Sequence, residues 1–219
     1  MSTPHPDPPP APPRLPALDH PTPLPADGLE GHETYTALWL RDQDLSGHTA
    51  AYLVLDGLRL TRVRLPGANW DHLRLTDAAV QGCDLTDATW EKATLGRVAF
   101  EECRLYGLRL EEARLEDITF AGCNASYAGF VKARFRRVRF AHCTLEEADF
   151  SGADLSGVIF ADCDLTRTVF HGARLRGADL RGCRLAGLQA GAADLKGAIV
   201  DPEQAVQIAR LLGLDVRWD

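Results

Sequence analysis

Apolar residues recur at every fifth position of this chain, and its cysteines recur at every twentieth. From Leu40 to Val200 every fifth residue is apolar, which makes 33 consecutive centres. The sequence contains six cysteines, which are Cys83, Cys103, Cys123, Cys143, Cys163 and Cys183. Neither the two-residue alternation of a strand nor the 3.6-residue turn of a helix produces these intervals over so long a stretch. The architecture must therefore repeat every five residues and again every twenty.

The residue two positions before each centre is also small or apolar, with Gln43, His48 and Thr168 as the clear polar exceptions. Residues i−2 and i of a short extended segment point to the same side, and the positions between segments are rich in residues that favour tight turns. Between residues 38 and 200 the chain has 21 Lys or Arg and 22 Asp or Glu, and none of them stands at an inward position. Because burying an unpaired charge is costly, this exclusion predicts a coil with a dry interior.

The cysteines indicate the number of sides of the coil. Each one stands two residues before a centre, so four five-residue units complete one coil and the cysteines line one wall. The aromatic residues have the same period: one column contains Phe100, Phe120, Phe140 and Phe160, and the opposite column contains Trp90, Phe130, Phe150 and Phe170. We predict an all-β solenoid, a four-sided β-helix of about eight coils over residues 34–200. A spacing of about 4.8 Å between coils gives a rod about 38 Å long.

The lines ADFSGADLSG and ARLRGADLRG, in which three of the four units follow the pattern A(D/N)(L/F)xx, closely resemble the pentapeptide-repeat family. The resemblance covers about three quarters of the chain and implies a right-handed, four-sided β-helix. The segment VDPEQAVQIARLLGLDV is similar to the C-terminal dimerisation helix of the Mfp and Qnr types of that family, which mimic duplex DNA and bind DNA gyrase or topoisomerase IV. The register has no projecting loops, which is closer to the Mfp type.

The two ends of the chain differ in composition from the coil. Eleven of the thirteen prolines lie in the first 30 residues, which predicts a disordered or polyproline arm over residues 1–33. Such an arm is usually a linker or tail, and the alternative is a ligand for a proline-binding domain. Residues 34–54 are less regular and are expected to cap the first coil.

Residues 201–219 are predicted to begin with a short helix. Asp201 is the expected N-cap, Pro202 stands at the first helical position and Gly213 follows the end. This segment is expected either to cap the last coil or to pair two rods. The residues that would do so are Ala205, Ile208, Leu211, Leu212, Leu214, Val216 and Trp218.

Charges on the outer faces alternate in sign between residues twenty apart. Three such series are Lys92, Glu112 and Lys132; Arg97, Asp117 and Arg137; and Asp154, Arg174 and Asp194. Each cross-coil pair is expected to contribute only about 0.2 to 1 kcal/mol. The coil is therefore nearly neutral, and most of the net charge of −7 comes from the two terminal segments. Local acidic doublets form a candidate partner-binding surface: Glu101, Glu102, Glu111, Glu112, Glu146 and Glu147.

The sequence shows no catalytic constellation. The cysteines stand at inward positions without inward histidines beside them and without CxxC spacing, so we interpret them as core thiols and expect no metal site. His142, next to Cys143, is expected to face outward, and no nucleophile, base and orienting acid come together. We expect no enzyme activity and no cofactor.

Function is therefore expected to come from the surface of a rigid rod. The first interpretation is a non-enzymatic protein-interaction scaffold of unknown partner. The alternative, which the resemblance implies, is a DNA-mimicking binder of DNA gyrase or topoisomerase IV that modulates fluoroquinolone sensitivity and forms a dimer through its C-terminus. The near-neutral coil favours the scaffold, because a mimic of duplex DNA should be acidic along its length.

Nucleic-acid binding and membrane association are the interpretations that the sequence favours least. Basic residues do cluster between Lys132 and Arg139, but acidic residues surround them and the aromatic residues face inward. The chain has no signal-like start and no long apolar run, which predicts a cytoplasmic protein without a membrane partner.

Overall fold

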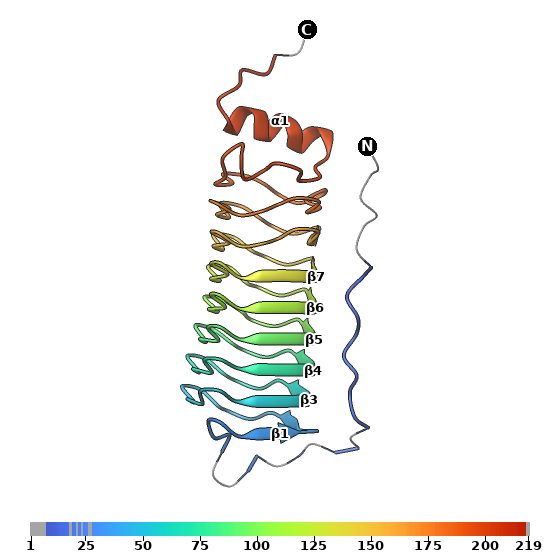
Figure 1. The fold of residues 1–219 in the computed structure, drawn as a ribbon, viewed down its shortest axis with the longest axis vertical. Helices are drawn as coiled ribbons and strands as arrows, with labels where there is room; N and C mark the ends of the chain where they lie inside the picture. The colour runs from blue at the N-terminus through green and yellow to red at the C-terminus, as the bar shows by residue number, and fades with distance from the viewer. Residues whose placement is uncertain (1–7, 18, 21, 23, 26–27, 218–219) are drawn as a thin grey trace.

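The structure is a computed structural model that describes residues 8–217 except residues 18, 21, 23, 26 and 27. The chain rises as a stack of coils with one helix at its C-terminal end (Figure 1). In chain order the elements are β1 (Thr34–Thr36), β2 (Trp39–Arg41), β3 (Val54–Thr61), β4 (Arg74–Gln81), β5 (Thr94–Glu101), β6 (Arg114–Ala121), β7 (Arg134–Ala141), β8 (Ile159–Ala161) and α1 (Pro202–Leu211). The predicted all-β solenoid with a short C-terminal helix is confirmed.

Two neighbouring sides of the rod form a continuous parallel sheet, because each of the strands β3 to β7 includes two of the four centres of its coil. Its strands are ordered β1-β3-β4-β5-β6-β7-β8, and β2 also pairs with β3. Every paired residue stands opposite the residue twenty positions later, as Leu55 does with Leu75. The other sides are joined by short parallel bridges with the same offset, such as Asp44 to Arg64 and Thr49 to Asn69. The twenty-residue coil predicted from the cysteines is therefore the repeating unit.

After each centre from Leu40 to Leu185 the chain bends, and the second residue after the centre has a positive φ. The angle is 58° at Tyr52, 68° at Gly57 and 52° at Arg62. A residue with a side chain loses roughly 1 to 2 kcal/mol in this left-handed region, and glycine does not. The turns tolerate side chains here because each turn is bonded to the next coil, as when the N–H of Tyr52 donates to the carbonyl of Asp71 at 2.8 Å.

The interior is filled by two aromatic columns that meet inside the coil. Phe140 stacks on Phe120 at 4.6 Å and on Phe160 at 5.1 Å between ring centroids. Phe130 and Phe150 stack at 4.7 Å in the opposite column, and Phe130 meets Phe140 edge to face. All five rings are fully buried. The columns predicted from the sequence are confirmed.

The polar exceptions at inward positions find hydrogen-bond partners. Thr168 is fully buried and donates its hydroxyl to the carbonyl of Leu145 at 2.8 Å. His48, in an early coil, accepts from the indole Nε1 of Trp70 at 3.0 Å, and partial burial lowers the pKa of His48. Each polar side chain is thus held where an apolar one stands in other coils.

The last coil departs from the predicted register. Ala193 was expected to face inward and is exposed, while Leu195 and Val200 are only half-buried. In the regular coils the N–H of a turn residue donates to the carbonyl nineteen residues later, as Gly157 does to Arg176. At the last coil the N–H of Gly177 donates to the carbonyl of Gly197, which is twenty residues later. The reason is that no further coil follows, so residues 192–197 form an irregular turn, and Gln204 of the C-terminal segment bonds Leu180 and Cys183 of the coil before it.

Candidate interaction surfaces

The six cysteines are buried free thiols. The Sγ atoms of Cys123, Cys143 and Cys183 each donate to a phenylalanine carbonyl of the preceding coil, at 3.4 to 3.6 Å. The neighbouring thiol of Cys143 and burial raise the pKa of Cys163 to about 12. Such a group stays protonated at neutral pH and is a poor nucleophile. All six thiols lie in the interior of the coil.

Helix α1 covers the open end of the last coil through one buried glutamine. Asp201 caps the helix by accepting from the N–H of Gln204 at 2.9 Å, and the Gln204 side chain accepts from the N–H of Asp201 at 3.0 Å. The same side chain donates to the carbonyls of Leu180 at 2.7 Å and Cys183 at 2.8 Å. The capping box and the coil end are therefore joined by Gln204.

Other residues of the C-terminal segment remain at the surface. Leu211 is 40% exposed, Leu212 41% and Leu214 62%, whereas Ile208 is half-buried against the core. Ala205 is exposed and Val216 is half-buried. Trp218, the last residue predicted for this surface, lies outside the described residues. The segment thus covers the coil end through Gln204 and leaves Leu211, Leu212 and Leu214 partly exposed.

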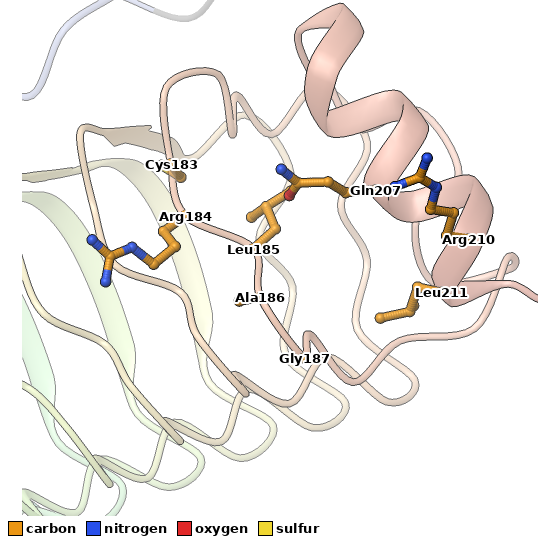
Figure 2. A pocket seen from close by; sticks show the side chains of 8 residues that line it. All are labelled: Cys183, Arg184, Leu185, Ala186, Gly187, Gln207, Arg210 and Leu211. Atoms are coloured by element: carbon orange, nitrogen blue, oxygen red, sulfur yellow. The ribbon is translucent and has the colours of Figure 1, made fainter. Parts of the chain in front are cut away.

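A pocket of about 360 Å³ lies where α1 meets the last regular coil. Figure 2 shows its lining from residues 183–187 of the coil and from Gln207, Arg210 and Leu211 of the helix. The thiol of Cys183, which lines the pocket, is hydrogen-bonded to the neighbouring thiol of Cys163 and buried, and both effects raise the pKa of Cys183 and make it a poor nucleophile. The pocket is a seam between coil and helix.

The acidic doublets predicted as a partner-binding surface lie on three different sides of the coil, because their positions do not differ by multiples of twenty. Arg167 bonds both Glu146 and Glu147, at 2.5 and 2.7 Å. Arg109 pairs with Glu111 at 3.1 Å. Glu101, Glu102 and Glu112 are exposed. The fold does not bring the six carboxylates together into one acidic patch.

Arginine–carboxylate pairs join successive coils, with the arginine twenty residues after its partner. Arg97 forms two bonds to Asp77, at 2.7 and 2.6 Å, and Arg137 forms two to Asp117, both at 2.7 Å. The two aspartates are each only 8% exposed. These guanidinium contacts are the main cause of the lowered pKa of Asp77 and of Asp117.

Not every predicted charge series forms pairs. In the described part of the chain no ion pair links Lys92, Glu112 and Lys132. In the third series Arg174 pairs with Asp154 at 3.7 Å, whereas Asp194 instead accepts from the N–H of Gly172. The twenty-residue repeat places these charges on neighbouring coils, but the direction of each side chain determines which of them form ion pairs.

The proline-rich arm, expected to be disordered or polyproline, lies beside the rod over residues 8–17 (Figure 1). The N–H of Ala11 donates to Asp117 at 3.0 Å and the N–H of Arg14 to Asp77 at 2.7 Å. Arg59 donates to the carbonyl of Pro16 at 3.0 Å. Sequence reasoning missed this contact; the available signal was that Ala11 and Arg14, which carry N–H groups, stand three residues apart among prolines.

The structure adds two findings on other kinds of site. Among the described residues, no group of three or more His, Cys, Asp or Glu is arranged to hold a metal ion. In the same part of the chain no helix has both the length and the apolar character of a membrane span.

Comparisons with known proteins match the repeat. A model described as a pentapeptide repeat region matches residues 93–161, and one described as pentapeptide repeats (8 copies) matches residues 55–89, 148–187 and 163–200. A search of curated proteins finds no match.

Several solved structures are similar. HetL, a pentapeptide repeat protein involved in heterocyst differentiation regulation in the cyanobacterium Nostoc, is 24% identical over 77% of this chain and 87% of its own, with a TM-score of 0.31. QnrB1, a plasmid-mediated fluoroquinolone resistance protein, is 23% identical over 84% of this chain and 99% of its own, with a TM-score of 0.39. A pentapeptide repeat protein of the Arabidopsis thaliana thylakoid lumen is 19% identical over 53% of this chain and 67% of its own, with a TM-score of 0.20.

Proposed function

Since the chain belongs to the pentapeptide-repeat family, we propose that it is a non-enzymatic, rigid scaffold for protein interaction. One observation carries this proposal: the inward positions of the regular coils hold a continuous apolar core, and the charged side chains lie outside it in a fixed twenty-residue register. A surface held in this way presents the same pattern of side chains at all times. Binding to a preformed surface avoids the entropic cost of ordering it.

The acidic doublets supply three matched probes of this surface. The variants are Glu101→Lys with Glu102→Lys, Glu111→Lys with Glu112→Lys, and Glu146→Lys with Glu147→Lys. Each reverses two charges on a different side; the second and third variants also break ion pairs with Arg109 and Arg167, so the denaturation midpoint of each variant is measured alongside capture. We expect a cellular partner to be captured by the wild type and by two of the variants and to be lost with the third. Identical partners for all four proteins would contradict the proposal.

The second candidate is binding to DNA gyrase or topoisomerase IV as a mimic of DNA. The exposed Leu211, Leu212 and Leu214 favour it, because they offer an apolar contact through which two rods would join end to end into a longer one. The cross-coil pairs of arginine with carboxylate weigh against it, since they neutralise part of the acidic surface that mimicry needs.

A supercoiling assay separates the two candidates. Purified protein is titrated into DNA gyrase with and without a fluoroquinolone. Inhibition, or protection from the drug, at micromolar protein supports the DNA mimic. No effect at high excess removes gyrase as the partner and leaves the scaffold proposal standing.

A further inference from the structure

The contacts of the arm follow the repeat of the coil. Arg14 and Ala11 are three residues apart, and the aspartates that accept their N–H groups are forty residues, or two coils, apart. Three residues of a polyproline II helix advance about 9.3 Å, because each residue rises about 3.1 Å. Two coils advance about 9.6 Å at about 4.8 Å each. One turn of polyproline II therefore matches two coils.

Burial along the arm has the same three-residue period. Pro10, Pro13 and Pro16 are half-buried, as is Leu15 next to Pro16, whereas Ala11 and Arg14, the two N–H donors, remain exposed. The prolines fix φ near −65° and bias the residues before them toward extended conformations, so this segment is held close to polyproline II. An extended helix with three residues per turn presents every third residue on one side. The arm thus lies against the rod along a single face.

The face beneath the arm is shaped to receive it. At Gly57, which has a φ of 68°, an added Cβ would lie 3.0 Å from the Cδ of Pro16. The side chains of Asp77 and Asp117 are already oriented by Arg97 and Arg137. Acceptors held in place by other groups lose little freedom when a peptide binds.

We propose that this face of the rod, from Gly57 to Asp117, is a binding site for polyproline II segments that carry N–H donors three residues apart. Residues 8–17 of the chain occupy it in the structure. A proline-rich segment of a partner with the same spacing of donors binds when the arm leaves, so the arm controls access. This inference rests on the proposed scaffold function for its biological meaning, and it names the kind of partner.

Trypsin measures docking of the arm in the full-length protein, because the bond after Arg14 is cleavable only when the arm is released. Ala11→Pro removes one N–H donor and keeps the extended backbone, whereas the matched Ala11→Ser keeps the donor. We expect about tenfold faster cleavage after Arg14 in Ala11→Pro than in the wild type or in Ala11→Ser, as one charge-assisted hydrogen bond is lost. Free peptides of residues 8–17 with each substitution correct for the preference of trypsin itself. Equal corrected rates in all three proteins would overturn the proposal.

Binding in trans is tested with a fluorescent peptide of residues 8–17 added to full-length protein. The Ala11→Pro, Arg14→Pro protein, whose own arm lacks both donors, is expected to bind the peptide saturably and at least tenfold more tightly than the wild type, whose arm competes at a high effective concentration. Adding Asp77→Ala and Asp117→Ala should abolish binding. In the same Ala11→Pro, Arg14→Pro protein, the control substitution Asp42→Ala breaks the similar pair with Arg62 and should leave peptide binding unchanged.

The outcome separates this inference from the scaffold proposal. Absence of saturable peptide binding, or binding that does not depend on Asp77 and Asp117, would overturn the polyproline site. Partner capture that responds to reversal of one acidic doublet would still support the scaffold in that case.

Discussion

Gln204 donates its side-chain amide to the carbonyl of Leu180 at 2.7 Å, and so a helix residue satisfies the backbone where the stack of coils ends. A second bond from the same amide reaches the carbonyl of Cys183 at 2.8 Å. Gln204 is only 3% exposed, so these carbonyls have little access to water. Open ends of stacked strands invite association unless they are covered.

Gln204→Ala is therefore expected to destabilise the protein. The carbonyl of Cys183 loses its donor and the carbonyl of Leu180 keeps only the N–H of Cys183, which should lower the free energy of unfolding by about 1 to 3 kcal/mol. Chemical denaturation followed by circular dichroism measures the change. Gln207→Ala, at an exposed position of the same helix, is the control and should leave the midpoint nearly unchanged. Equal midpoints for the two variants would show that Gln204 does not close the coil.

The repeating part of this fold was predictable because each five-residue unit has the same pattern, an apolar centre with a small or apolar residue two positions before it. An apolar centre such as Phe140 has one allowed direction, and many units in register reinforce one another. Ala193 satisfied the rule and yet is exposed, because the coil that would bury it does not exist. The contacts of Gln204 with the coil end and of Asp117 with the arm could not be predicted for a related reason. Each involves a segment outside the repeat, and the five-residue period says nothing about where such a segment lies.

The aromatic columns predict a large cost for truncation. Phe140 is fully buried between Phe120 and Phe160, and Phe140→Ala leaves a cavity that neighbouring coils cannot close without breaking their hydrogen bonds. We expect the free energy of unfolding to fall by about 3 to 5 kcal/mol. Tyr127→Ala, at an exposed turn residue, is the comparison and should cost far less. An unchanged denaturation midpoint for Phe140→Ala would mean that the ring does not contribute to the core.

Acid is expected to remove the contribution of Asp117. Hydrogen bonds from Arg137 and from the N–H of Ala11, and the nearby charge of Arg97, lower the pKa of this carboxyl in the folded protein. A carboxyl with a lowered pKa stabilises the fold above its ordinary pKa, near 4, and the stabilisation is lost as the pH falls through the lowered value.

Comparison of the wild type with Asp117→Ala tests this pH dependence. The wild type should have the higher free energy of unfolding at pH 7, by about 1 to 3 kcal/mol, and the gap should narrow as the pH falls below about 4. Asp42→Ala, which removes an exposed pair with Arg62, should show a smaller gap at every pH. A gap for Asp117→Ala that is constant with pH would assign its effect to packing.

The exposed leucines of the C-terminal segment predict self-association through the capped end of the rod. Leu212 is 41% exposed beside Leu211 and Leu214, and three large apolar side chains in water favour contact with a second copy. Light scattering of the wild type should give the mass of a dimer, and Leu212→Asp should halve it because a charge in that contact would lose its water. Tyr127→Asp places the same charge at an exposed aromatic position along the rod and should leave the dimer intact. A monomeric wild type, or a mass that Leu212→Asp does not change, would assign the helix to capping alone.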